Sequence, residues 1–242
     1  MFTAEFRDRV REHVLALADA DPRVVAAAAV GSLAIAGDRW SDLDFTFAVE
    51  GSVDEVISEW TREMVSEFEA AVLFDLPLGN VVYRVFLLPG CLQVDLSFAP
   101  REEFGARGPK FSLVFGEAAE VPQTPQPDPR EVFGYAAHHA VRAYFCIQRG
   151  NLWQAEFWIS GVLNDALELA CLNRGIEAVY GRGRDRLPPE VLDALEGALV
   201  RSIDPQELGR AHAAAVAGLL RESELAGDLA EQVEPMLREL TA

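Results

Sequence analysis

The segment VVAAAAVGSLAIAGDRWSDLDFTFAV, residues 24–49, decides how this chain folds. An apolar run, Val24–Val30, leads into a Gly31-Ser32 step, and Asp42 and Asp44 then open a second apolar run. Apolar runs of this length, bounded by glycine and polar residues, predict two strands joined by a loop. Residues two apart on a strand point to the same face, so the two aspartates should lie side by side.

Two neighbouring carboxylates repel each other unless a cation neutralises them. Oxygen ligands of this kind suit Mg²⁺, and a Gly-Ser turn can bring backbone N–H groups against a phosphate. The stretch 91–98 alternates strictly, with Gln93, Asp95 and Ser97 on one face and apolar residues on the other. If it pairs beside the strand of Asp42 and Asp44, the three carboxylates converge and can hold two metal ions for attack on a phosphoryl group.

The order Gly31-Ser32, Asp42-x-Asp44 and a later Asp95 resembles the motif of the DNA polymerase β-type nucleotidyltransferase superfamily. The likeness covers roughly residues 20–100. It implies that the Gly-Ser turn contacts the nucleotide triphosphate and that the three aspartates bind Mg²⁺.

An α/β part followed by a helical part of similar size is most similar to the aminoglycoside and lincosamide nucleotidyltransferase branch. This resemblance implies two Mg²⁺ ions and ATP or another NTP as donor, with Ser41 as a further nucleotide-binding residue. A nucleoside monophosphate, AMP from ATP, would pass to a hydroxyl of a small-molecule acceptor, and pyrophosphate would be released.

Two other functions remain open. One is a non-catalytic or regulatory member of the same fold that binds a nucleotide or a partner, as antitoxin-like members do. The other is an enzyme that modifies a protein or a nucleic acid.

The chain is strongly acidic, with 39 Asp and Glu against 21 Lys and Arg and a formal net charge of −18. This charge argues against a nucleic-acid partner, because Lys and Arg supply most nonspecific affinity for phosphate backbones. It favours a cationic acceptor instead. The cysteines lack metal-ligand spacing, the first residues do not form a signal peptide, and no apolar run is long enough to span a bilayer. We therefore expect a cytoplasmic protein without a membrane partner.

Four prolines between residues 122 and 129 predict a stiff linker. We expect an α+β fold: a catalytic α/β domain with a mixed twisted sheet over residues 1–121, and an all-α substrate-binding bundle over residues 130–242. The expected strands are 23–30, 42–49, 71–75, 81–88, 92–98 and 111–115. The expected helices are 3–20, 52–70, 130–149, 151–174, 189–201, 205–223 and 225–240. The last two helices complete the bundle or form a homodimer contact.

Three residues outside the motif are further candidates. Glu156 is the acidic member of an otherwise apolar helical stripe, so its burial would make it a plausible general base. The alternatives are a structural pair between Glu156 and Arg142, and Asp95 as the base. Arg142 could instead contact triphosphate oxygens or bond a carboxylate such as Asp165, and Lys110 could touch phosphate.

Overall fold

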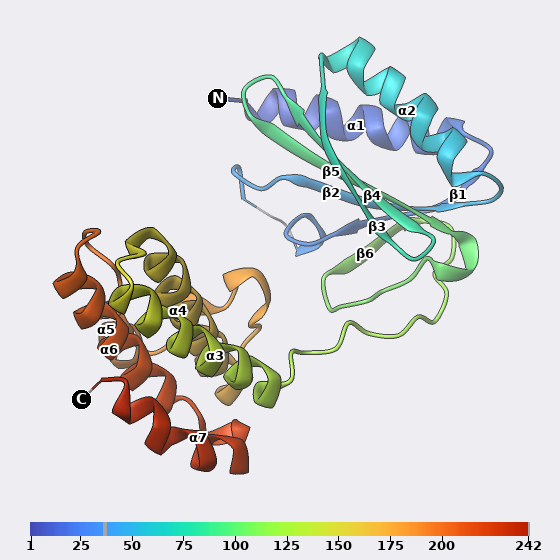
Figure 1. Ribbon diagram of the computed structural model, residues 1–242. Coiled ribbons are helices and arrows are strands. Elements are labelled where there is room, and N and C mark those ends of the chain that lie inside the picture. Colours follow the sequence, from blue (N-terminus) through green and yellow to red (C-terminus); the bar gives the residue numbers. More distant parts are fainter. Residues whose placement is uncertain (36–37, 242) are drawn as a thin grey trace. The chain divides into compact units, whose positions relative to one another are not determined.

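The computed structural model describes residues 1–35 and 38–241. The chain forms two compact units, Met1–Thr124 and Pro125–Ala242, and each is described by itself (Figure 1). The division falls inside the proline-rich stretch 122–129 for which the sequence predicts a linker. No helix among the described residues has both the length and the apolar character required to cross a membrane.

The first unit is built on a six-stranded sheet in the order β3-β4-β5-β2-β1-β6. Strands β2 and β5 pair in parallel and the other neighbours pair antiparallel, so the sheet is mixed as the sequence predicts. The elements are α1 (Ala4–Ala20), β1 (Val24–Val30), η1 (Leu33–Ile35), β2 (Leu43–Val49), α2 (Val53–Phe68), β3 (Ala71–Leu78), β4 (Val81–Leu88), β5 (Leu92–Pro100), η2 (Arg101–Glu103) and β6 (Phe111–Phe115).

One face of this sheet is covered by α1 and α2, which lie on the same side of it in Figure 1. Because strand side chains alternate, Leu43, Phe45 and Phe47 of β2 all enter the core beneath these helices. Asp44 must then point to the opposite face. The alternation of apolar and polar residues along β2 thus determines which face of the sheet carries the acidic groups.

Each helix of this unit begins at a capping residue that stands first in its expected range, Thr3 for 3–20 and Ser52 for 52–70. The hydroxyl of Thr3 accepts a hydrogen bond from the N–H of Phe6 at 3.2 Å, and the hydroxyl of Ser52 accepts one from Glu55 at 3.3 Å. Each cap satisfies an N–H group that has no partner within its helix.

The predicted end of the third strand, residue 75, is wrong, because β3 continues to Leu78 and includes Pro77. β3 lies at the edge of the sheet and pairs on one side alone, where Pro77 faces Val82. An edge strand tolerates proline because the missing N–H is not needed by a second neighbour.

The second unit is entirely helical. Its elements are α3 (Pro129–Gln148), α4 (Leu152–Asn173), η3 (Val179–Gly181), η4 (Arg184–Arg186), α5 (Pro189–Glu196), α6 (Pro205–Arg221), η5 (Glu224–Ala226) and α7 (Asp228–Glu239). Its apolar core is formed mainly by α3, α4 and α6, with small residues such as Ala140 and Ala143 at the helix contacts. A mixed sheet followed by an all-helical unit confirms the predicted α+β fold class.

Two predicted helix boundaries in this unit are wrong. α5 ends at Glu196 instead of residue 201, since the carbonyls of Gly197 and Leu199 accept hydrogen bonds from the Arg210 guanidinium instead of continuing the helix. The last helix begins at Asp228 instead of residue 225, because Gly227 has a φ of +57° and separates it from a short 3-10 turn.

Candidate active site

Three carboxylates converge on the face of the sheet opposite α1 and α2. Asp44 and Asp95 are register partners on the adjacent parallel strands β2 and β5, and Asp42 immediately precedes β2. One oxygen of each carboxylate lies within 4.8 Å of the others, and all three residues are half-buried. The strand that carries Asp95 therefore pairs beside the strand of Asp42 and Asp44, which is the arrangement that the predicted metal site requires.

The amide of Gln93 holds one of these carboxylates. Its Nε2 atom lies 3.1 Å from both carboxylate oxygens of Asp95 and donates to them. Burial raises the pKa of the Asp95 carboxyl group; the Gln93 amide opposes this shift, and the charge of Asp42 adds to it. A carboxylate that is costly to ionise because it is buried beside another acid is stabilised by a nearby cation.

Gly31 gives this cluster the space it needs. A Cβ atom at this position would lie 2.5 Å from Oδ2 of Asp44, and the residue has a φ of +61°. Only glycine adopts this φ without strain and also leaves room for the carboxylate. The N–H of Gly31 donates to the Lys110 carbonyl at 3.2 Å, and the Ser32 hydroxyl lies 3.5 Å from Oδ1 of Asp42.

The residues present fit a divalent metal ion. The group of Asp42, Asp44 and Asp95 offers oxygen ligands only, which suits a hard cation such as Mg²⁺ better than Zn²⁺. Three acidic side chains this close together carry a repulsion that such an ion would remove.

No protein-family model and no curated protein matches the chain. Solved structures that are similar to it include the following two. An aminoglycoside 6-adenyltransferase from Bacillus subtilis has a TM-score of 0.40 and 13% identity, with 95% of this chain and 96% of that chain covered. The nucleotidyltransferase toxin MenT4 from Mycobacterium tuberculosis H37Rv has a TM-score of 0.26 and 15% identity, with coverages of 98% and 93%. The first is named an adenyltransferase and the second a nucleotidyltransferase.

Two further predicted residues lie near the carboxylates in the first unit. Lys110 directly precedes β6, and its carbonyl oxygen is bonded to the Gly31 N–H. Ser41 directly precedes Asp42, and its hydroxyl lies 3.4 Å from Oδ1 of Asp38. Both are therefore adjacent, through the backbone, to residues of the site.

Glu156 and Arg142 belong to the second unit. Glu156 is half-buried on α4 and accepts a hydrogen bond at 2.7 Å from the hydroxyl of Ser160, one helical turn later. The Arg142 guanidinium lies over the ring of Trp158, 5.6 Å from its centroid. Glu156 and Arg142 thus have separate neighbours, in place of the Glu156–Arg142 pair that the sequence offers as an alternative.

Asp165, the other carboxylate considered for Arg142, is bonded to a histidine. Its Oδ2 atom lies 2.9 Å from Nδ1 of His139, and burial raises the pKa of Asp165 to about 6 against the opposing effect of that histidine. Gly161 lies against the same ring, since a Cβ there would be 2.9 Å from Nδ1 of His139.

Sequence reasoning placed Gln93 on the acidic face but gave it no role. The available signal was its position two residues before Asp95 on an alternating strand, which puts both side chains on one face. Phe2 and Cys91 line the same pocket as Asp42. The sequence did not predict this, because no local pattern links either residue to the site.

Proposed function

We propose that this chain is a nucleotidyltransferase that moves a nucleoside monophosphate, AMP from ATP, onto a hydroxyl of a small molecule. The observation that carries the proposal is the convergence of Asp42, Asp44 and Asp95 beside the Gly31-Ser32 turn, in the order of the superfamily's motif. Each residue of that motif has a defined position in one small region of the first unit.

Asp42, Asp44 and Asp95 would hold two Mg²⁺ ions, which when bound supply positive charge for the phosphate oxygens of the nucleotide. Ser32 offers a hydroxyl beside Asp42 for the triphosphate, and Lys110, whose carbonyl is bonded to the Gly31 N–H, would supply a positive charge for the phosphates. The role of Gly31 is steric, because its N–H is already bonded to the Lys110 carbonyl.

The acceptor hydroxyl attacks the α-phosphorus, and the bond from that phosphorus to the bridging oxygen of pyrophosphate breaks. Pyrophosphate leaves with the electron pair, and the hydroxyl proton passes to a carboxylate. Two carboxylates are candidates for this base: Asp95 within the acidic group, and Glu156 on α4. Positioning of the two substrates and neutralisation of charge would account for most of the rate enhancement.

The net charge of −18 supports a cationic acceptor, because an acidic surface raises the local concentration of cations. An aminoglycoside- or lincosamide-type antibiotic is the acceptor class that the resemblance suggests. The same charge disfavours a nucleic-acid acceptor.

The test is a matrix of ATP, GTP, CTP and UTP with Mg²⁺ against a panel of hydroxyl-bearing small molecules, with pyrophosphate release as the readout. We expect release that depends on the metal, on one preferred NTP and on an acceptor. Metal-dependent NTP binding without any release would support the non-catalytic alternative. The absence of both NTP binding and release would overturn the proposed function.

A further inference from the structure

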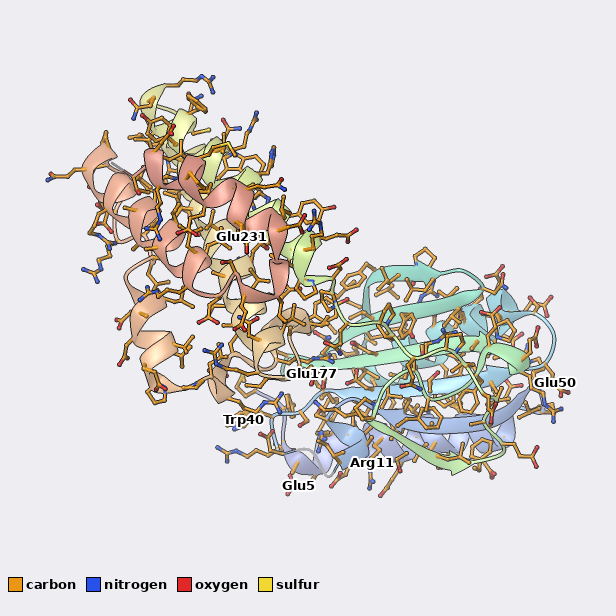
Figure 2. The ribbon with its side chains drawn as sticks, turned by 90° about the horizontal axis from the view of Figure 1, so that it is seen from below. Glu5, Arg11, Trp40, Glu50, Glu177 and Glu231 are labelled. Carbon is orange, nitrogen blue, oxygen red and sulfur yellow. The ribbon has the colours of Figure 1, made fainter. Side chains whose placement is uncertain are left out.

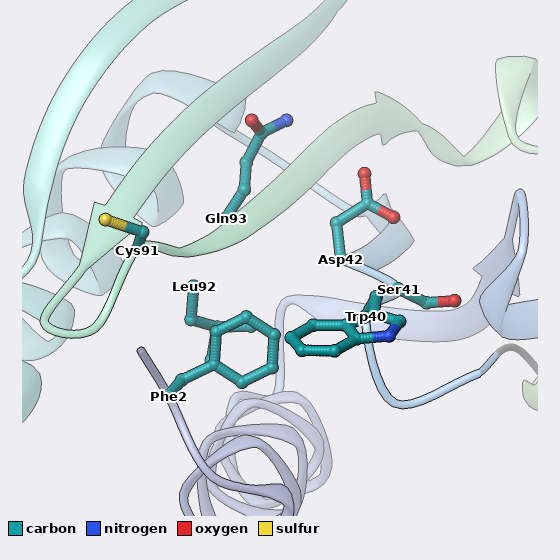
Figure 3. A pocket seen from close by; sticks show the side chains of 7 residues that line it. All are labelled: Phe2, Trp40, Ser41, Asp42, Cys91, Leu92 and Gln93. Atoms are coloured by element: carbon teal, nitrogen blue, oxygen red, sulfur yellow. The ribbon is translucent and has the colours of Figure 1, made fainter.

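A hollow in the first unit lies beside Asp42 and has a volume of about 270 Å³. Three segments far apart in the sequence line it: Phe2 before α1, the residues Trp40–Asp42 before β2, and the residues Cys91–Gln93 at the start of β5. Figure 3 shows the rings of Phe2 and Trp40 on one side of it and the side chains of Asp42 and Gln93 on the other.

Backbone hydrogen bonds hold two walls of this hollow in place. The N–H of Phe2 donates to the carbonyl of Gly90 at 2.9 Å, and a Cβ at Gly90 would lie 2.6 Å from that nitrogen. The N–H of Trp40 donates to Oδ1 of Asp38 at 2.8 Å, and the N–H of Ser41 to the Asp38 carbonyl at 3.2 Å. These hydrogen bonds therefore fix the positions of two of the segments that line the hollow.

The strand order places this hollow on a defined side of the carboxylates. β2 lies between β1, which ends at the Gly31-Ser32 turn, and β5, which begins with Leu92 and Gln93. The turn that would take the triphosphate and the hollow at the start of β5 thus flank Asp42 and Asp44 from opposite sides. In phosphoryl transfer the attacking and leaving oxygens lie roughly in line, on opposite sides of the phosphorus.

We infer that this hollow binds the acceptor, specifically a hydroxyl-bearing ring of the acceptor molecule. The inference rests on the proposed function, which puts pyrophosphate at the turn and so requires the attacking hydroxyl to arrive from the side of β5. From that side the acceptor oxygen forms its bond to the α-phosphorus as the bond to pyrophosphate breaks. The hydroxyl proton passes to a carboxylate and pyrophosphate leaves with the electron pair.

The lining defines what the hollow recognises. Phe2 and Trp40 supply aromatic surface, while Ser41, Asp42 and Gln93 supply a hydroxyl, a carboxylate and an amide; the Leu92 side chain is fully buried. Aromatic walls with a few polar groups select a flat or ring-shaped ligand that carries hydroxyls. A volume near 270 Å³ corresponds to roughly nine waters of bulk liquid, which matches one substituted ring.

Trp40 is well suited to stack on such a ring. Its side chain is 59% exposed at the surface of the first unit (Figure 2), and the Arg39 guanidinium lies over the indole, 4.2 Å from the ring centroid. A cation over one aromatic ring orients it and also disfavours a positive charge on the ring that stacks there.

The test measures ring binding and nucleotide binding separately, on the full chain with Mg²⁺ and α,β-methylene-ATP, which cannot release pyrophosphate. Saturation-transfer NMR follows phenol and myo-inositol as ring probes, with ethanol as the hydroxyl compound that lacks a ring. We expect at least one ring probe to bind in the millimolar range. Trp40→Ala should raise its Kd about fivefold or more, whereas Trp153→Ala, which removes a 76% exposed tryptophan from the second unit, should not.

Chemical modification of Cys91 provides an independent second test of ring binding. Cys91 is exposed and lines the hollow, while Cys146 and Cys171 are buried, so N-ethylmaleimide should modify Cys91 selectively. We expect the adduct to abolish ring binding and to change the affinity for α,β-methylene-ATP by less than about twofold. Ring binding that is absent in the wild type, or that survives both Trp40→Ala and the adduct, would overturn the inference while nucleotide binding persists. Loss of nucleotide binding in the wild type would overturn the proposed function, and this inference with it.

Discussion

Gly31 and Asp44 are so close that a single methyl group on Gly31 would lie 2.5 Å from a carboxylate oxygen of Asp44. Contacts this short between non-bonded atoms do not persist, so either the carboxylate or the turn would have to move. Gly31, which begins the motif, and Asp44 of its Asp-x-Asp pair are therefore a single geometric unit.

Gly31→Ala should displace Asp44 and weaken metal-dependent NTP binding at least about tenfold. It should also lower the free energy of unfolding by about 1 kcal/mol, because alanine is strained at a φ of +61°. Isothermal titration with Mg²⁺ and NTP, together with denaturant unfolding, measures both effects.

Gly79→Ala is the matched control for this prediction. Gly79 has a φ of +64°, but a Cβ there meets nothing within 4 Å. We expect the same loss of stability with unchanged NTP binding. Equal NTP binding in Gly31→Ala and Gly79→Ala would refute the spatial role of Gly31.

Asp44→Asn should abolish metal binding at the site and reduce pyrophosphate release at least about 100-fold, because it removes one of three converging charges. Without added metal the same variant should be at least as stable as the wild type, since it relieves repulsion among the carboxylates. Thermal unfolding with and without Mg²⁺ tests this, because an ion that binds the folded state alone raises its stability.

Glu67→Gln is the control for Asp44→Asn. Glu67 is exposed on α2, the helix that covers the other face of the sheet. Its substitution should leave both the Mg²⁺-dependent stabilisation and the turnover unchanged. Full turnover by Asp44→Asn would disprove the metal assignment.

Gln93→Leu should lower the affinity for the metal about tenfold without changing the set of ligands. Its amide bonds both oxygens of Asp95 at 3.1 Å, and residues that orient a metal ligand in this way contribute 10- to 100-fold to affinity in general. Mn²⁺ binding followed by electron paramagnetic resonance measures the change directly. An unchanged affinity would show that Asp95 is held by its strand alone.

Local patterns predicted much of this site, and their physical origin is clear. The alternation of Leu43, Phe45 and Phe47 with polar residues set the face on which Asp44 lies, and the same rule set the face of Asp95. The caps at Thr3 and Ser52 were also readable, because each is satisfied within one turn of its own helix.

Contacts between segments that are far apart in the sequence could not be predicted from local patterns. β2 pairs with β5 and skips the two strands between them in the sequence, so the Asp44–Asp95 register depends on the whole sheet. The hydrogen bond between Phe2 and Gly90 likewise joins two segments that are far apart in the sequence of the first unit. A hydrophobic period in the sequence identifies a single helix or strand and its apolar face. It carries no information about which helices or strands become neighbours.

Glu156→Gln distinguishes the two candidates for the general base. If Glu156 accepts the hydroxyl proton, kcat should fall about 100-fold, because the amide of glutamine cannot take up that proton. Ser160→Ala is the control, because it removes the 2.7 Å hydrogen bond but keeps the carboxylate. A rate for Glu156→Gln that matches the wild type from pH 6 to 9 would make this residue structural and assign the proton to Asp95.

The stability of the second unit should depend on the protonation of Asp165. Burial raises the pKa of Asp165 from 3.8 to about 6 in the folded chain, with His139 opposing the shift and Glu168 and Arg184 exerting smaller effects. The folded state therefore binds a proton more tightly than the unfolded state between these two values. The contribution of Asp165 is greatest below about pH 4 and declines as the pH rises to about 6, by at most roughly 3 kcal/mol.

Asp165→Asn removes this dependence because asparagine does not titrate. The free energy of unfolding of Asp165→Asn relative to the wild type should therefore increase between pH 4 and pH 7, even though the variant weakens the bond to His139. Carbon-13 NMR of the carboxyl group gives the titration midpoint in the folded protein independently of stability. A midpoint below 4, or a stability difference that stays constant with pH, would show that the His139 contact outweighs the cost of burying the charge.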